Sequence, residues 1–222
     1  MRLLAFDTAT SQCSAAVWAD GAVAARETEP MRRGHAEALM PMIQRVLAAA
    51  ESRYADLDAV AATVGPGAFT GLRVGLATAR GLVLAAGIPG IGITSLEAVA
   101  ANDPTDGPRL VALDARRRDL YVQAFAADGT PLTDAAACLP ADLPAHVAGL
   151  DGPWTVAGDA AETAAGALGA PVADTPGVPD AGVVAALAAH RDPAGHPLEP
   201  LYLRPPDATP PADGGRVRPA AS

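Results

Sequence analysis

The chain has 222 residues, of which 50% are hydrophobic and only 4% aromatic, so Ala, Val and Leu must supply most of its core. It carries 16 Lys and Arg against 25 Asp and Glu, and this net charge of −9 argues against a main role in binding nucleic acid. Because no secretory signal and no apolar run of roughly 18 residues is visible, we expect a cytoplasmic protein that does not contact a membrane.

The first half of the chain predicts a mixed sheet with helices packed on it. Asp20-Gly21 marks a hairpin turn between two strands, and apolar side chains follow helical spacing in two long segments. Ser95 is expected to cap a further helix, with Glu97 in its first turn. The predicted order is strand, strand, strand, helix, strand, helix, strand, over residues 2–6, 14–19, 22–27, 35–51, 58–64, 70–86 and 88–93.

The second half begins with the same pattern of three strands and an Asp-Gly turn, here Asp128-Gly129. Its predicted strands cover residues 109–113, 120–126, 131–133 and 154–157, and its predicted helices lie near residues 160–168 and 182–190. A repeated start of this kind predicts two lobes of related topology. We expect one lobe over residues 1–103, a smaller lobe over 109–204, and a disordered Pro-rich tail over 205–222.

The glycine-rich segment from Gly65 to Gly71 joins a predicted strand to a predicted helix. It has neither the Gly-Lys-Ser/Thr of a Walker A loop nor the spacing of a dinucleotide-binding fingerprint. Glycines continue into the helix at four-residue spacing, through Gly71 and Gly75, and each buried one costs roughly 1 kcal/mol of helix propensity. Two functions stay open: a cradle of backbone N–H groups for a phosphate, or close packing of the helix against another backbone.

An aspartate followed by hydroxyl side chains ends the first predicted strand, as Asp7-Thr8-Ala9-Thr10. Such a turn can hold a phosphate and its metal, although Ala9 stands where a phosphate site normally has glycine. The alternative is a structural turn in which Asp7 accepts backbone N–H bonds. The candidate residues for a residual nucleotide contact are Asp7, Thr8, Thr10, Gly65 and Gly67.

The sequence contains no complete catalytic or metal-binding motif. A second metal ligand one turn after His35 would fall at position 39, which is Leu, and Cys13 and Cys138 form no C-x-x-C pair. We therefore expect no catalytic residue, no metal, and no cofactor bound by this chain alone. An ATPase or small-molecule kinase that uses Asp7 and the glycine-rich segment is the alternative hypothesis.

Several motifs, in order along residues 2–204, resemble those of the bacterial TsaB (YeaZ) family. They are Phe6-Asp7-Thr8-Ala9-Thr10, His35-Ala36-Glu37, the segment from Gly65 to Gly75, Asp114-Ala115-Arg116-Arg117, and Pro200-Leu201-Tyr202-Leu203-Arg204. The resemblance implies an α/β fold of the actin-like and sugar kinase-like (ASKHA) class, with two lobes that each contain a mixed sheet with helices packed on it.

The resemblance also implies a role in making N6-threonylcarbamoyladenosine at position 37 of tRNA. In that family the paralogue TsaD carries the metal and transfers the threonylcarbamoyl group, TsaB is its non-catalytic partner, and the ATPase TsaE joins them. The implied partners are therefore a TsaD-like paralogue and a TsaE-like ATPase, with tRNA bound indirectly through the complex. ATP or ADP would then belong to the complex, and the chain in isolation would form a homodimer.

By similarity, the pairing surface consists of the first-lobe helices, which form a four-helix bundle with the partner. Carried onto this sequence, these helices are the two predicted over residues 35–51 and 70–86. The small-residue and apolar stripes of the second helix predict that it is buried on two faces. The predicted partner interface is His35, Leu39, Met42, Ile43, Val46, Gly71, Leu72, Gly75, Leu76, Ala79 and Val83.

Overall fold

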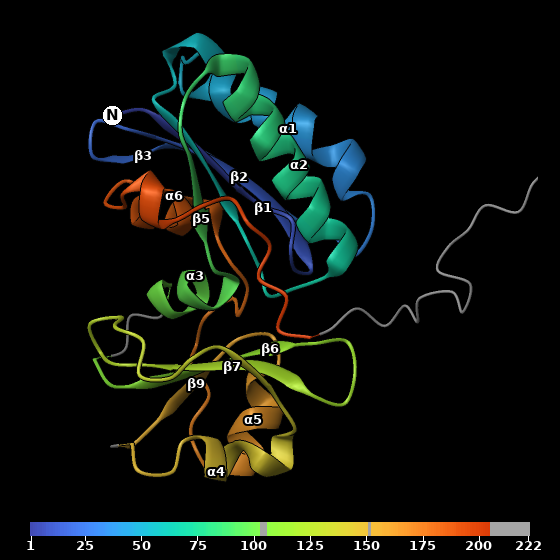
Figure 1. Cartoon of the computed structure of the whole chain (residues 1–222), viewed down its shortest axis with the longest axis vertical. Helices are drawn as coiled ribbons and strands as arrows, with labels where there is room; N and C mark the ends of the chain where they lie inside the picture. The colour runs from blue at the N-terminus through green and yellow to red at the C-terminus, as the bar shows by residue number, and fades with distance from the viewer. Residues whose placement is uncertain (103–105, 151, 205–222) are drawn as a thin grey trace, which may run out of the picture.

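The computed structural model describes residues 1–102, 106–150 and 152–204 and has two lobes, each built around one sheet (Figure 1). The strand order is β3-β2-β1-β4-β5 in the first sheet and β8-β7-β6-β9 in the second. The first-lobe elements are β1 (Leu3–Asp7), β2 (Gln12–Ala19), β3 (Ala22–Pro30), α1 (His35–Ala49), η1 (Tyr54–Asp56), β4 (Ala59–Thr63), α2 (Phe69–Ala86) and β5 (Gly90–Ile93). They are followed by α3 (Ser95–Ala101), β6 (Arg109–Asp114), β7 (Leu120–Phe125), β8 (Ala136–Cys138), η2 (Pro140–Asp142), α4 (Leu143–His146), β9 (Thr155–Ala157), α5 (Ala161–Leu168), α6 (Ala181–Ala188) and η3 (Pro193–Gly195).

The first sheet is covered on both faces because its central strand is apolar on both. Strand β1 pairs antiparallel with β2 and parallel with β4, and all five of its residues are buried. Leu4 and Phe6 point to the face covered by α1 and α2, whereas Leu3 and Ala5 point to the face covered by α6. The two long helices lie side by side on the outside of the molecule (Figure 1).

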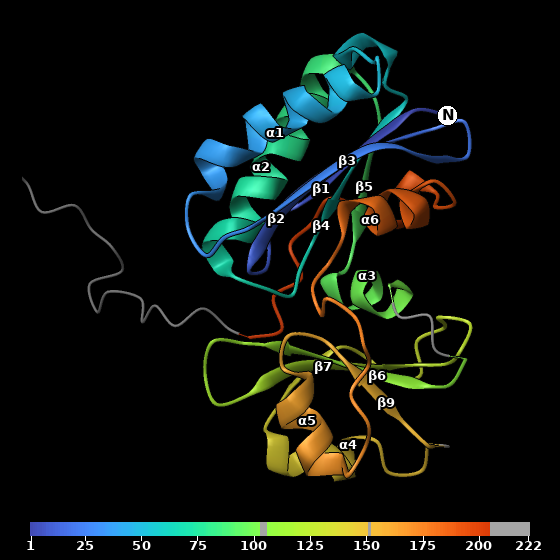
Figure 2. The ribbon, with the colours of Figure 1, turned by 180° about the vertical axis from the view of Figure 1, so that it is seen from behind.

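The second sheet packs on α3 with one face and on α4 and α5 with the other. Seen from behind, α3 and α6 lie between the two sheets (Figure 2). Helix α6 packs against β1 and β2, so residues 181–188 belong structurally to the first lobe. The predicted boundary of the second lobe at residue 204 is therefore wrong, because the chain returns to the first sheet after α5.

The predicted helices and most of the predicted strands are present within a few residues of their expected bounds. Two local predictions are wrong. Thr94, not Ser95, caps α3, since the Thr94 side chain accepts the Glu97 N–H and Glu97 reaches back to the Thr94 N–H. Residues 131–133 form only an isolated bridge between Pro131 and Phe125, and residues 136–138 form the edge strand instead. The predicted disordered tail, 205–222, lies outside the described residues.

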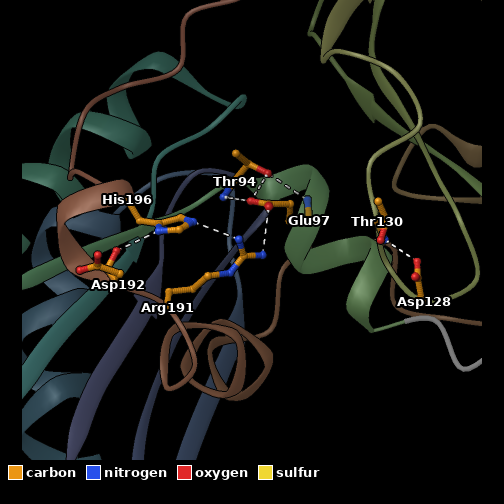
Figure 3. A network of polar contacts seen from close by, with 7 residues as sticks. All are labelled: Thr94, Glu97, Asp128, Thr130, Arg191, Asp192 and His196. Carbon is orange, nitrogen blue, oxygen red and sulfur yellow. Dashed lines mark hydrogen bonds and ion pairs between the residues drawn. The ribbon is translucent and has the colours of Figure 1, made fainter.

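A polar network links α3 to the segment that follows α6 (Figure 3). The Arg191 guanidinium lies between the Glu97 carboxylate, with Nη2 3.4 Å from Oε1, and the His196 ring, with Nη1 3.0 Å from Nε2. His196 Nδ1 lies 2.9 Å from the carbonyl oxygen of Asp192. Because a guanidinium and a carbonyl oxygen leave only one role for each ring nitrogen, Nε2 accepts and Nδ1 donates.

The last described segment, residues 196–204, runs across the first lobe as a strap. It accepts a hydrogen bond from the Gly92 N–H at His196 O (2.8 Å) and donates one from Leu201 N to Val64 O (2.7 Å). Two side chains of α2 hold it as well, since Arg80 donates to Leu198 O and Arg73 donates to the Tyr202 hydroxyl. The strap therefore fixes one flank of α2.

Candidate functional site

The turn after β1 uses its polar atoms internally. Asp7 is fully buried and accepts hydrogen bonds from the Thr63 hydroxyl, from the Ala9 N–H (3.0 Å) and from the Thr10 hydroxyl (3.1 Å). The Thr8 hydroxyl donates to Gly71 O at 2.8 Å. The structure thus brings Asp7, Thr8 and Thr10 together, in the hydrogen-bonded arrangement of a structural turn.

The glycine-rich segment lies directly against this turn. Ala68 N–H donates to Ala9 O at 2.7 Å, and a Cβ added at Gly67 would lie 2.2 Å from the same oxygen. A Cβ at Gly71 would lie 2.0 Å from Thr8 O, and one at Gly75 would lie 2.6 Å from Thr8 Oγ1. Of the two functions that the sequence left open, the geometry is that of close backbone packing, because the two segments are in contact.

Gly65 lies apart from these contacts, because it packs against the strap. Its φ is +98°, and an added Cβ would lie 3.1 Å from Leu201 O. The nucleotide contact predicted for Gly65, Gly67 and the β1 turn stays a prediction, and the atoms named for it already have protein partners.

Burial makes the Asp7 carboxyl hard to ionise. Desolvation raises its pKa from 3.8 to about 6, although hydrogen bonds from Thr63, Ala9 and Thr10 and the nearby His35 work in the opposite direction. In the second lobe, Asp159, two residues after β9, also has a raised pKa because of burial, and it accepts a hydrogen bond from the N–H of Asp114, the residue that ends β6 as Asp7 ends β1. Each lobe therefore has a buried aspartate after a strand that serves as a hydrogen-bond acceptor within the chain.

Most side chains predicted to contact a partner lie inside the chain's own core. All of them except the half-buried Val83 are buried, and the apolar ones contact β1, β2 and β4 across the helix–sheet interface. A buried side chain has almost no surface left for a partner. The residue assignment therefore needs correction for His35, Leu39, Met42, Ile43, Val46, Gly71, Leu72, Gly75, Leu76 and Ala79, whereas the use of α1 and α2 as an interface stays a prediction.

The same two helices present a different, exposed surface, which we call the outer helix face. It consists of Ala36, Met40, Gln44 and Ala48 of α1 and Thr70, Ala77, Gly81, Leu84 and Ala85 of α2, all exposed. None of these residues is charged. Of the charged residues nearby, Arg45 pairs with Glu27 of β3 and Arg73 and Arg80 bind the strap, whereas the exposed Glu37 of α1 borders this face.

A cavity of about 610 Å³ opens at one end of the outer helix face, between α1 and the end of α2. Its walls are apolar and include Met40, Tyr54, Leu82, Ala85 and Ile88. Leu84, which is 86% exposed, precedes the lining residue Ala85 in the same turn of α2. Helix α2 is also long and apolar enough to span a membrane by length and composition, with 28% of it buried. Its inner side packs on β4, so its unusual feature is the apolar outer side.

Within the described residues, no group of three His, Cys, Asp or Glu side chains is arranged to hold a metal ion. His35 is 8% exposed, and its Nε2 has no hydrogen-bond partner among these residues. Cys13 is a buried strand residue, and burial raises the pKa of its thiol to about 12, as expected for a structural cysteine.

Comparisons with known proteins agree with this architecture. A family model described as TsaD, tRNA N6-adenosine threonylcarbamoyltransferase, matches residues 27–188. TsaB of Escherichia coli, a tRNA threonylcarbamoyladenosine biosynthesis protein, is 42% identical over 54% of this chain and 53% of its own. The chain belongs to the TsaB/YeaZ family. An uncharacterized protein of Mycobacterium tuberculosis is 40% identical over 94% of both chains, so the similarity to relatives extends through both lobes.

Solved structures confirm the predicted fold. YeaZ from Pseudomonas aeruginosa superposes with a TM-score of 0.72 at 25% identity, over 91% of this chain and 99% of that chain. The activator of 2-hydroxyisocaproyl-CoA dehydratase from Clostridium difficile has a TM-score of 0.50 at 12% identity over 85% of this chain, which shows a shared fold alone. The chain has the two-lobed ASKHA fold, and its family takes part in tRNA threonylcarbamoyladenosine biosynthesis.

Proposed function

We propose that this chain is a non-catalytic subunit that binds a TsaD-like transferase through the outer helix face and thereby supports threonylcarbamoylation of tRNA in the cytoplasm. A TsaE-like ATPase would join the same complex, and the chain would pair with itself when no transferase is present. The observation that carries the proposal is the uncharged, largely apolar surface of two adjacent helices, next to an apolar cavity.

An exposed apolar surface of this extent needs an explanation. Leu84 and Met40 are exposed at 86% and 38%, and small residues such as Ala77 and Gly81 lie between them. Small side chains allow a partner helix to approach closely, and apolar patches bordered by polar residues mark protein interfaces. Fully covering the Leu84 side chain alone would contribute roughly 2 kcal/mol to association.

The transfer chemistry is assigned to the partner. The family resemblance implies that the metal-bearing paralogue has two histidines one helical turn apart, whereas in this chain Leu39 follows His35 at that spacing. The Leu39 side chain packs in the core and the His35 side chain is buried, so this turn of α1 is used for packing. The polar atoms of Asp7 are likewise occupied by Thr63, Ala9 and Thr10.

A matched pair of variants tests the interface. Leu84→Asp places a charge on the outer helix face, whereas Leu139→Asp makes the same change at an exposed leucine of the second lobe. Both side chains are exposed, so both variants should keep the stability of the native chain within about 0.5 kcal/mol. We expect Leu84→Asp to abolish co-elution with the TsaD-like protein of the same organism and Leu139→Asp to leave it intact. Co-elution of both variants would show that α2 is not the contact surface.

A reconstituted reaction tests the functional role. Purified chain mixed with tRNA and threonylcarbamoyl-adenylate should give no modified adenosine, and adding it to the TsaD-like and TsaE-like proteins should raise the yield severalfold. Modification by the chain alone, or an unchanged yield in the mixture, would overturn the proposal. Calorimetry with ATP and Mg²⁺ on the isolated chain tests the alternative of an independent ATPase or kinase.

A further inference from the structure

A second cavity, of about 600 Å³, lies where the two lobes meet, at the starts of α1 and α2. Arg32 and Arg33 from the loop before α1 line it, together with Arg116 from the turn after β6. Among the residues that line it, Glu37 is the one carboxylate. We call this site the arginine cavity. Its walls therefore carry a net positive charge in a chain whose net charge is −9.

Two of the three arginines of this cavity, Arg32 and Arg33, differ from five arginines elsewhere in the described chain. Those five form ion pairs with a carboxylate: Arg26, Arg45, Arg53, Arg191 and Arg204. By contrast, Arg32 and Arg33 are exposed and make no ion pair or hydrogen bond with another described residue. Arg116 is 3.7 Å from Asp114, and both side chains remain about two-fifths exposed. An acidic chain that leaves adjacent arginines unpaired keeps them available for an external anion.

Exposed aromatic rings lie at the edge of the same cavity. Phe69 lines it and is 53% exposed, and the Arg73 guanidinium lies 3.7 Å from the centre of its ring. The Tyr202 ring, 44% exposed, is centred 5.8 Å from the Phe69 ring. Aromatic rings and arginine planes beside unpaired positive charge are the elements with which proteins bind unstacked bases of RNA.

We propose that the arginine cavity binds RNA directly, with Arg32, Arg33 and Arg116 on backbone phosphates and Phe69 and Tyr202 against an unstacked base. The inference rests on the proposed function, since that function supplies tRNA as the nucleic acid. It goes beyond an indirect role, because the chain itself would contact the RNA at the edge of the outer helix face, with which the cavity shares Ala36 and Thr70. A strand of RNA suits the site better than a free polyphosphate, because the arginines come from both lobes and the adjacent glycine-rich segment is packed against Ala9 and Thr8.

The test is fluorescence anisotropy of the full chain with a labelled RNA hairpin that has the sequence of a tRNA anticodon arm. Arg32→Ala/Arg33→Ala should weaken binding at least tenfold and lower the slope of log K against log salt by about 1.5, as expected when two phosphate contacts are lost. The control is Arg45→Ala/Arg53→Ala, which removes the same charge from exposed arginines outside the cavity. Phe69→Ala should weaken binding without changing the salt slope.

Each outcome decides the proposal. Equal losses in the cavity variant and the control variant would show binding through overall charge and would overturn it. Displacement of the hairpin by ATP at the concentration of the RNA would show a site for free nucleotide and would also overturn it. Failure here leaves the proposed function intact if the same Arg32→Ala/Arg33→Ala chain still co-elutes with the TsaD-like protein, because that contact uses Leu84 and its neighbours.

Discussion

Gly71 gives the sharpest test of how α2 is packed. The helix approaches the turn after β1 so closely that a Cβ at Gly71 would lie 2.0 Å from the backbone oxygen of Thr8. This is about 1.4 Å inside ordinary van der Waals contact, and the obstructing atom belongs to the backbone, so it cannot rotate away. Gly71→Ala must therefore move the helix or the turn, and it disturbs the hydrogen bond from the Thr8 hydroxyl to Gly71 O.

Two terms of opposite sign set the size of the effect. Replacing a helical glycine with alanine gains about 1 kcal/mol of helix propensity, and forcing extra atoms into a packed site costs about 1–3 kcal/mol. Because the clash is with backbone, we take the upper end and expect a net loss of about 2 kcal/mol for Gly71→Ala. Gly81 lies in the same helix with no atom within 4 Å of an added Cβ, so Gly81→Ala keeps only the gain.

Thermal unfolding followed by far-ultraviolet circular dichroism separates the two variants. At about 2–4 °C per kcal/mol for a chain of this size, Gly71→Ala should lower Tm by about 4–8 °C. Gly81→Ala should raise Tm by about 2–4 °C. If both substitutions raised Tm by the same amount, the close contact between α2 and the β1 turn would be refuted.

Asp7→Asn should gain stability relative to the native chain as pH rises from about 4 to 6. The buried carboxyl has a pKa of about 6 against 3.8 for an ordinary aspartate, so the protonated form contributes its full stabilisation below about pH 4, and this contribution is lost as pH rises through 6. The variant's gain in unfolding free energy over native protein should grow by up to about 3 kcal/mol from pH 4 to pH 8, measured by urea titration; a constant difference would contradict the buried state. His196→Leu should speed hydrogen exchange of the Gly92 amide, which donates to His196 O, whereas the exposed control His190→Leu should not; equal exchange rates would exclude a role of the ring.

Much of the fold could be predicted from turn residues and apolar spacing, because these features act between residues that are close in the sequence. The Asp20-Gly21 turn has positive φ at both residues, 54° and 86°, as a tight hairpin of this type requires. After the second Asp-Gly turn, the strand predicted over residues 131–133 is wrong. Pro131 has no N–H for a ladder, and the Thr133 hydroxyl accepts the Ala124 N–H instead, so the next strand is displaced to residues 136–138.

The sequence contains no comparable signal for which helix packs on which sheet. Helix α6 is apolar on nearly every side, and its sequence does not say which sheet it will cover. It packs on β1 and β2, more than 160 residues earlier in the chain, because Leu3 and Ala5 leave the second face of the first sheet uncovered. The arginine cavity was missed for the same reason. Arg32, Arg33 and Arg116 are too far apart in sequence to register as one patch, and the fold brings them together.

The candidate interface shows what periodicity can and cannot decide. The sequence identified the right kind of helix, with two stripes of small and apolar residues, but both the Gly71 stripe and the Leu72 stripe face the chain's own turn and sheet. The sequence does not mark the stripe through Ala77, Gly81 and Leu84 as the exposed one, because this stripe is no more apolar than the buried stripes. Arg73 and Arg80 extend along one flank of α2 and bind the strap, so the stripe through Ala77, Gly81 and Leu84 carries no charge. The variant Arg80→Ala removes the hydrogen bond from Arg80 to Leu198 O of the strap. Hydrogen exchange of the Leu201 amide, which donates to Val64 O, should then become faster, while Leu84 remains exposed.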